Sequence, residues 1–354
     1  MRYCTQLEPE ALLSSFLAHP PQGFRAERLD SGLPLFCARL DLLTTADDAL
    51  RARVAALPGY RWWRRWLEWN ACFIGCTVTE YAPLPLAGHI EALADETLAQ
   101  ARRAPLLIVK DLPWESPLLD VHGNQRAEAF AQALAERGFV LMQGMSLAWV
   151  PIDFAGEDEY LAQLSSGRRR DIRRKLRARA RLRVECQPTG AACFDDPALC
   201  QRYYALYLNV YAQSQIHFDL LGPEFLAELL RDGGSGGRVF AYYHGEALVG
   251  WNLCYEHAGM LVDKYVGFAY PQAREHNLYA VSWMHNLEYA RGQGLSHYVA
   301  GWTDPEIKRY LGARLSPTRH AVYARNPLLR LLLRRNAHRF EHEAGDMPQA
   351  EAMG

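Results

Sequence analysis

A dense basic segment is the first feature of the chain with residue types suited to binding chemistry. Residues 168–183 read RRRDIRRKLRARARLR and hold ten basic residues and one acidic residue. The local charge is +9 while the whole chain carries −1, so the remainder carries −10. We expect Arg170, Arg173 and Arg174 to contact a phosphate-bearing ligand: a tRNA, the phosphopantetheine arm of a carrier protein, or an anionic substrate. A solvated helix that pairs with the acidic remainder is the alternative interpretation.

A second candidate is the strand-like run LVDKYVGF, which places acid–base groups side by side. Strand alternation predicts that Asp263, Tyr265 and Gly267 share one face, while Val262, Lys264 and Val266 take the other. A carboxylate beside a phenol can accept one proton and donate another. The alternative is that Asp263 is a strand-end carboxylate paired with an arginine.

The segment that follows, AYPQAREHNLYAV, opens a helix soon after that strand. Such a helix start presents unpaired backbone N–H groups and a positive dipole end, which suits pyrophosphate or another anion. We expect four residues here to bind a cofactor: Gln272, Arg274, His276 and Asn277. His276 can also serve as a base, or simply cap the helix. His217, in QSQIHFD, is a further polar candidate for substrate binding, with a structural loop histidine as its alternative.

Lysine is scarce, since only four of the 39 basic residues are lysines: Lys110, Lys175, Lys264 and Lys308. The arginine bias is attributable to codon composition, which makes the remaining lysines more informative. A lysine ammonium is a point charge that suits a phosphate or a developing oxyanion. Lys308, in EIKRYLG, is the strongest single candidate.

The elements that position these residues form two successive mixed α/β halves. In the second half, three antiparallel strands are followed by a helix, a strand, a short helix, a strand and a basic amphipathic helix. The expected ranges are 238–245, 247–259 and 260–268 for the meander, then 277–290, 295–302, 304–314, 320–325 and 327–340. We place the boundary between an N-terminal lobe (1–155) and a C-terminal lobe (156–342) near Gly156, and expect a loose tail over 343–354.

Composition narrows the class of protein. The chain has 354 residues, is 49% hydrophobic and is 22% charged, which excludes disorder and indicates two domains or one elaborated fold. The longest apolar run, LLRLLL, is cut by an arginine, so we expect no membrane span. The near-neutral net charge argues against a general DNA-binding role.

The eight cysteines are irregularly spaced, which indicates a reducing cytoplasm. Cys72 and Cys76 form the one close pair, and without a second pair or a histidine cluster no metal site is expected. Burial of both as small apolar side chains is the better interpretation. Trp62, Trp63, Trp66 and Trp69 are spaced so that three share a helical face, and we expect this stripe to be core rather than a base-stacking platform.

The second half resembles the GNAT acyltransferase superfamily, in particular its two-lobed Fem-like and peptidoglycan-biosynthesis-like branch. The resemblance rests on the opening SSGRRRDIRRKLRARARLRVE, the HNL at a helix start, and the close GLSHYVAGWTDPEIKRYLGARLSPTRH. It covers about residues 156–325, while the first half matches in architecture only. The implied fold is a mixed, mostly antiparallel sheet flanked by helices, in two tandem GNAT-like lobes.

The resemblance also implies roles for individual residues. It places the Asp263 strand beside the acyl group, so that Asp263 is a candidate base and Tyr265 a neighbouring donor. Tyr310 lies where many GNAT enzymes have a tyrosine general acid, and Lys308 where the Fem-like branch has its lysine. The chain departs from the superfamily at 272–277, where QAREHN contains no glycine of the usual pyrophosphate loop.

The expected function is cytoplasmic N-acyl transfer, in which an amine of a small molecule or cell-wall-type precursor attacks an activated acyl carbonyl directly. The donor would be acyl-CoA or an acyl-carrier thioester, used as a co-substrate, with no tightly bound cofactor. A tRNA-dependent Fem-like aminoacyl transferase is the first alternative, with tRNA or acyl carrier protein as the macromolecular partner. A non-catalytic binding protein on the same fold is the second.

Overall fold

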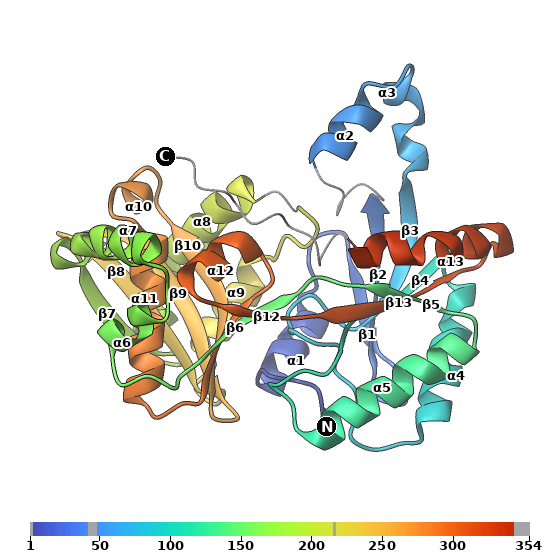
Figure 1. Ribbon diagram of the computed structural model, residues 1–354, viewed down its shortest axis with the longest axis horizontal. Coiled ribbons are helices and arrows are strands. Elements are labelled where there is room, and N and C mark those ends of the chain that lie inside the picture. The colour runs from blue at the N-terminus through green and yellow to red at the C-terminus, as the bar shows by residue number, and fades with distance from the viewer. Residues whose placement is uncertain (1–2, 42–47, 215–216, 343–354) are drawn as a thin grey trace.

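The computed structural model describes residues 3–41, 48–214 and 217–342. Two sheets, each flanked by helices, form two lobes that lie side by side (Figure 1). This arrangement confirms the predicted mixed, mostly antiparallel fold.

The first sheet has six strands, and β3 and β4 are its only described parallel neighbours. Its order is β1 (Arg25–Arg28), β2 (Pro34–Asp41), β3 (Glu68–Ile74), β4 (Leu106–Pro113), β13 (Thr318–Ala324) and β5 (Val140–Gln143). The second sheet has seven strands, and within the described chain only β10 and β11 run parallel. Its order is β12 (Arg314–Ser316), β6 (Leu147–Pro151), β11 (His297–Gly301), β10 (Met260–Phe268), β9 (Ala247–His257), β8 (Gly237–His244) and β7 (Arg183–Pro188).

The two halves of the chain exchange strands. β6 comes from the first half but pairs with β11 in the second sheet, and β13 comes from the second half but lies between β4 and β5. Each lobe is therefore completed by a strand of the other half. The lobe boundary at residues 155 and 156 stays a prediction, and these two strands cross it. The predicted tail, 343–354, lies outside the described residues.

Helices cover both sheets (Figure 1). In the first lobe they are α1 (Glu10–Ala18), α4 (Ile90–Ala99), α5 (Val121–Glu136) and α13 (Pro327–His342), while α2 (Asp48–Ala55) and α3 (Tyr60–Trp63) stand away from the sheet. In the second lobe they are α6 (Glu157–Ala162), α7 (Ser166–Leu176), α8 (Pro197–Gln213), α9 (Pro223–Arg231), α10 (Gln272–Glu275), α11 (Leu278–Gly292) and α12 (Pro305–Leu311). Capping sets several starts: the Asp196 carboxylate accepts from Ala198 N at 2.9 Å, and Pro197 fills the first turn of α8.

One apolar cluster joins the lobes. Phe36 and Phe73 of the first sheet belong to the same buried cluster as Phe225 of α9 and Trp251 of β9. Burying each such side chain contributes roughly 1.5–3 kcal/mol, so this cluster holds the two sheets in a defined relation. None of the helices in the described part of the chain combines the length and apolar composition needed to cross a bilayer.

The tryptophan stripe is core only in part: Trp69 packs against the apolar cluster that joins the lobes, but Trp62 does not. Trp62 is 84% exposed on an arm, formed by α2 and α3, that projects from the first lobe (Figure 1). The helical face is interrupted because α3 ends at Trp63, a 3₁₀ turn follows over Arg64–Trp66, and Trp69 already belongs to β3. The four tryptophans therefore lie in three different backbone conformations rather than in one helix.

The cysteines behave differently from one another. Cys72 and Cys76 are both buried, as predicted, but Cys72 forms a disulfide with Cys37 that was not predicted, whereas Cys76 keeps a free thiol. The two residues face each other in the β2–β3 ladder, with Cα atoms 4.1 Å apart. Their separation of 35 residues hides this pairing in the sequence. In the described chain, no three His, Cys, Asp or Glu side chains gather as a metal site.

Candidate active site

The candidate site lies where β10 and β11 stop pairing. The parallel register covers only Met260 to Val262 against His297 to Val299. β10 then continues to Phe268, while β11 ends at Gly301 and leads into α12. Polar side chains from both lobes gather at this point.

A β-bulge in β10 determines which way these side chains point. Asp263 pairs with Cys254 and Tyr265 with Leu253, so Lys264 is the extra residue. Asp263 consequently contacts α11, whereas the Tyr265 ring packs against Tyr207 and Phe225. The prediction that Asp263 and Tyr265 share a face was therefore wrong, because the inserted residue reverses the alternation.

Asp263 is a buried carboxylate held by three donors. Its Oδ1 accepts from Asn252 Nδ2 at 2.6 Å, and its Oδ2 accepts from the Tyr298 hydroxyl at 2.7 Å and from Asn286 Nδ2 at 3.3 Å. Burial raises the pKa of Asp263, while the hydrogen bonds from Tyr298 and Asn252 oppose that rise. The carboxylate is thus fixed in position with little remaining capacity to accept hydrogen bonds.

Lys308 projects from α12 into the same region and is only 5% exposed. Among the described residues, its ammonium makes no hydrogen bond or ion pair. Burial lowers the pKa of Lys308 to about 8, against the opposing attraction of Asp263 and Glu80. A buried lysine without a direct partner is costly, which is typical of functional sites.

Glu80, a residue of the first lobe, also belongs to this site, because it lies close to Gly301. A Cβ built on Gly301 would lie 3.8 Å from Lys308 Nζ and 3.9 Å from Oε1 of Glu80. Glu80 comes from the loop after β3, and its Oε2 is buried without a hydrogen-bond partner in the described chain. The lysine and this carboxylate therefore face one point beside the Gly301 backbone.

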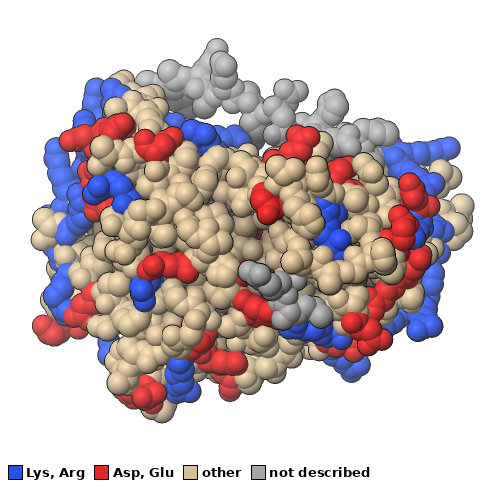
Figure 2. Space-filling model, turned by 90° about the horizontal axis from the view of Figure 1, so that it is seen from below, with Lys and Arg blue, Asp and Glu red and all other residues tan. Residues whose placement is uncertain are grey.

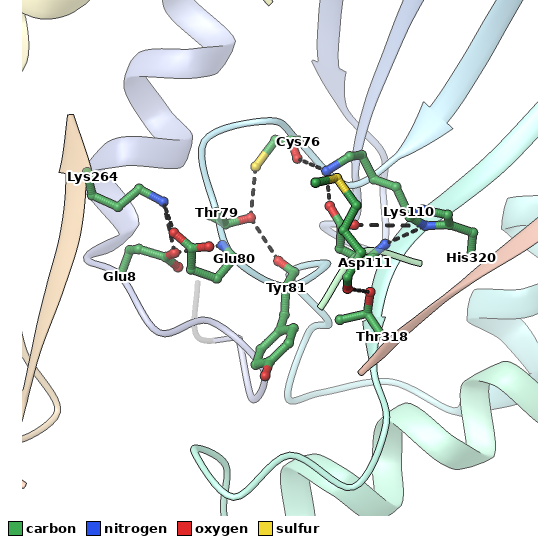
Figure 3. A network of polar contacts seen from close by, with 11 residues as sticks. Glu8, Cys76, Thr79, Glu80, Tyr81, Lys110, Asp111, Lys264, Thr318 and His320 are labelled. Atoms are coloured by element: carbon green, nitrogen blue, oxygen red, sulfur yellow. Dashed lines mark hydrogen bonds and ion pairs between the residues drawn. The ribbon is translucent and has the colours of Figure 1, made fainter. Parts of the chain in front are cut away.

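A buried ion network ties Glu80 to β10 (Figure 3). Lys264 Nζ lies 2.6 Å from Glu80 Oε1 and 3.2 Å from Glu8 Oε1, and Glu8 Oε1 also accepts from the Glu80 backbone N–H at 2.6 Å. Burial raises the pKa of Glu8 to about 7, although the Lys264 charge opposes the rise. Burial alone would lower the pKa of Lys264, but the carboxylates of Glu80 and Glu8 raise it above its usual value.

Tyr310 does not join this site. Its hydroxyl donates to Asp171 Oδ2 at 2.9 Å, in the contact between α12 and α7. Residues 308 and 310 are two apart on a helix, so their side chains leave it about 200° apart. The role of Tyr310 as a general acid stays a prediction without support from this arrangement.

The basic segment forms α7 and the 3₁₀ turn after it, and much of its charge is paired. Arg173 bonds Asp158 at 2.8 Å and Arg174 bonds Asp171 at 2.6 Å. Arg168 caps α12 by donating to the backbone carbonyls of Arg309 and Tyr310. Arg170 is exposed and forms no ion pair within the described chain. This helix therefore carries both arginines that are paired with acidic residues and an exposed arginine, Arg170, that is not paired within the described chain.

The four residues expected to bind a cofactor lie in and after α10. Arg274 stacks on Tyr270, 5.1 Å from its ring centroid, and donates to Gln213 Oε1 at 2.6 Å. His276 is buried, with its ring centroid 4.4 Å from that of His244. The remaining two are Gln272, the first residue of α10, and Asn277, whose φ of 49° starts α11. The segment 272–277, which lacks the glycines of the usual pyrophosphate loop, thus forms the short helix α10 and the start of α11.

His217 is likewise apart from Lys308. It is exposed, and its ring packs edge-on against Tyr211 of α8 with centroids 5.0 Å apart. Lys308 and Asp263 are therefore the predicted catalytic residues that the structure brings together, whereas Glu80 and Glu8 were missed. Neither glutamate lies in a motif, so no signal in the sequence marked them.

Comparison with protein families identifies the second lobe. Residues 166–309, which include Asp263 and Lys308, match the model of the family described as an acetyltransferase (GNAT) domain. This segment of the second lobe is similar to a GNAT domain. This confirms the predicted resemblance, and the GNAT domain makes the protein an acyltransferase. A comparison with curated proteins found no match.

Solved structures share the fold of the GNAT domain together with the first lobe. The C-terminal domain of a putative lysylphosphatidylglycerol synthetase from Agrobacterium fabrum has a TM-score of 0.52 at 11% identity, covering 92% of this chain and 93% of that one. L-PGS from Bacillus licheniformis has a TM-score of 0.52 at 10% identity, with 94% and 98% covered. FemX has 0.50 at 14% identity, with 92% and 98% covered. The whole chain therefore has a Fem-like fold.

Replacing Gly301 with alanine tests the geometry of the site. Gly301 has a φ of +80°, and the new methyl group would lie 3.8 Å from Lys308 Nζ and 3.9 Å from Glu80 Oε1. We expect kcat to fall about 100-fold, since small displacements of catalytic groups have effects of this size. The control is Gly259→Ala, also at positive φ (74°) but with open space around its Cβ, which should share the strain and keep kcat. Equal activity losses in both variants would contradict the prediction.

Proposed function

We propose that the protein transfers an acyl group from an activated donor to the amine of a small molecule or cell-wall-type precursor, by direct attack at the Lys308 site. The observation that carries this proposal is the buried ammonium of Lys308, which has no hydrogen-bond or ion-pair partner among the described residues and is close to the charges of Asp263 and Glu80. Such a site supplies both a positive charge and a proton acceptor to a reacting carbonyl and amine.

The proposed chemistry needs no covalent enzyme intermediate. The amine nitrogen attacks the acyl carbonyl, a C–N bond forms, and the carbonyl oxygen becomes an oxyanion that the Lys308 ammonium stabilises. The oxyanion then re-forms the carbonyl, the bond to the donor sulfur or oxygen breaks with its electron pair on that atom, and the proton that the amine loses balances the negative charge of the leaving group. Glu80 is the better acceptor for that proton, because Asp263 already accepts three hydrogen bonds while Glu80 Oε2 accepts none in the described chain. Asp263 instead provides a fixed negative charge that attracts the Lys308 ammonium.

The donor has two candidates. An acyl-CoA or carrier thioester is the leading one, because the matched domain is described as an acetyltransferase. An aminoacyl-tRNA is the second, supported by the fold shared over nearly the whole chain with FemX and with a protein named for lysylphosphatidylglycerol. The replacement of a glycine-rich loop by α10 also favours a donor other than coenzyme A.

Donor consumption in the presence of amines tests the function directly. The purified protein would be given acetyl-CoA, with thiol release as the readout, or tRNA charged with labelled amino acids, with loss of the label as the readout. Amino acids and polyamines serve as acceptors, and RNase abolishes only the tRNA reaction. Mass spectrometry of the molecules that copurify with the protein would identify further donors to assay, such as an acyl carrier. If a donor is consumed only when an amine is present and only when Lys308 is intact, the proposal is supported. If neither donor is consumed, and no copurified acyl carrier is consumed either, the proposal is overturned.

The exposed arginines of α7 provide a separate prediction. If the donor bears phosphates that contact this helix, Arg173→Glu with Arg174→Glu should raise its KM about tenfold and flatten the salt dependence of kcat/KM. The matched control is Arg202→Glu with Arg291→Glu, which changes the net charge equally at exposed positions outside α7. If both double variants have the same KM and salt dependence, α7 is only a solvated, ion-paired helix.

A further inference from the structure

Helix α13 has two apolar faces, and only one of them is buried. Leu329 and Leu333 pack against the cluster that joins the lobes. Leu328, Leu331 and Leu332, spaced as i, i+3 and i+4, point outward on the other side, and Leu328 is 71% exposed. Scattered exposed leucines need no explanation, but a leucine stripe along one helix marks an interaction surface.

The charge beside this stripe has one sign. Residues 325–335 hold four arginines and no acidic residue. Arg330 stacks on Tyr323, while Arg334 and Arg335 are exposed and form no ion pair within the described chain. The face of the molecule seen from below differs, because acidic and basic side chains are interspersed there (Figure 2). Arg334 and Arg335 therefore border the stripe with positive charge that no acidic side chain of the described chain pairs with.

The projecting arm has a similar composition. Residues 48–65, which begin at the first residue of α2, include five arginines and one acidic residue, Asp48. Trp62 and Leu57 are the large exposed hydrophobic side chains among the described residues of the arm. In Figure 1 the arm projects upward from the first lobe, and α13 lies across the upper part of the same lobe. Two segments far apart in the sequence thus present leucine, tryptophan and arginine on one lobe.

We propose that α13, assisted by Trp62 on the arm, docks the protein on the surface of a bilayer that contains anionic lipid. A basic amphipathic helix lies in the headgroup region with its apolar side chains inserted, and tryptophan prefers that same region. Each arginine near an anionic surface adds about 1 kcal/mol of attraction. The leucines distinguish this partner from RNA, because an aliphatic side chain offers no surface on which a base can stack. The inference concerns where the protein resides and does not depend on the proposed acyl transfer.

Co-sedimentation with vesicles tests the proposal. The full-length protein should bind vesicles of phosphatidylcholine with 30% phosphatidylglycerol at least tenfold more tightly than pure phosphatidylcholine, and binding should weaken severalfold when NaCl rises from about 0.1 M to about 0.5 M. Leu328→Gln with Leu331→Gln should reduce binding at least tenfold, because both side chains would otherwise insert. Arg334→Glu with Arg335→Glu should do so as well, and Trp62→Ala should have a smaller effect.

The matched control replaces two equally exposed residues elsewhere. Val121 is 71% and Leu86 is 47% exposed, against 71% and 48% for Leu328 and Leu331, so Val121→Gln with Leu86→Gln should leave vesicle binding unchanged. Equal losses in the two double variants, or wild-type binding to pure phosphatidylcholine as strong as to anionic vesicles, would overturn the proposal. So would leucine-dependent dimerisation in light scattering, or binding of single-stranded RNA through α13 in place of vesicles.

Discussion

Replacing Lys308 with methionine should lower kcat for acyl transfer by about 100- to 1,000-fold, with little change in KM. This is the usual effect of removing one preorganised donor from an oxyanion site. Methionine keeps the length and the apolar stem of the side chain but removes the charge. The loss therefore measures what the ammonium contributes in the transition state.

The matched control lies on the same helix. Arg309→Met removes a positive charge from the neighbouring exposed position of α12 and should leave kcat within about twofold. A Lys308→Met enzyme with kcat close to the wild-type value would show that the reacting carbonyl is placed elsewhere. Equal losses in both variants would indicate damage to α12 rather than loss of a catalytic charge.

The same substitution should make the protein more stable. Burial lowers the pKa of Lys308 from 10.5 to about 8, so keeping the ammonium charged in the folded state costs about 3 kcal/mol near neutral pH. Lys308→Met removes that cost, and urea unfolding at pH 7 should show a larger free energy of unfolding. Reduced activity together with increased stability is the signature of a residue retained for function. In the wild-type enzyme, the rate should fall as pH rises through about 8, because the ammonium is then lost.

The fold of the second lobe was largely predictable from local pattern. The meander of β8, β9 and β10 and the succession α11, β11 and α12 follow from apolar alternation, turn residues and a proline at the first position of α12. The sheet that each strand joins was not predictable. β13 carries the apolar pattern of a strand in the second lobe, yet it pairs with β4 of the first, some 210 residues earlier in the chain. Alternation encodes a buried face and says nothing about which partner covers it.

The site was predictable only in part, for two physical reasons. Lys308 and Asp263 stand out by their scarcity, their strand context and the family resemblance. The bulge at Lys264 cannot be read from an unbroken apolar alternation, so the face of Tyr265 was assigned wrongly. Glu8 and Glu80 lie 256 and 184 residues from Lys264, and no residue near either glutamate in the sequence indicates a buried cation. Long-range ion pairs leave no periodic signal.

Replacing Lys264 with methionine should have the largest effect on stability, lowering the free energy of unfolding by about 3–5 kcal/mol. Lys264 is the cation that both Glu8 and Glu80 contact, and all three side chains are almost fully buried. Its removal leaves two carboxylates in an apolar environment at the contact between the lobes. Lys175→Met is the control, because Lys175 pairs with Asp171 near the surface, where such a bridge contributes about 0–1 kcal/mol. Urea unfolding at pH 7 separates the two variants, and equal losses would show that the buried network is no stronger than a surface pair.

The pH dependence of stability then isolates Glu8. Burial raises its pKa from 4.5 to about 7, so the protonated form is favoured in the folded protein. The contribution of Glu8 to the free energy of unfolding is fully present below pH 4.5 and is lost as the pH rises through about 7. The total change in the free energy of unfolding is about 3 kcal/mol. Glu8→Gln mimics the protonated side chain and should remove this slope from unfolding curves measured between pH 4 and 8. An unchanged slope would mean that Glu8 remains ionised beside Lys264 throughout that range. The Lys264→Met loss would then come from two charged carboxylates rather than from one.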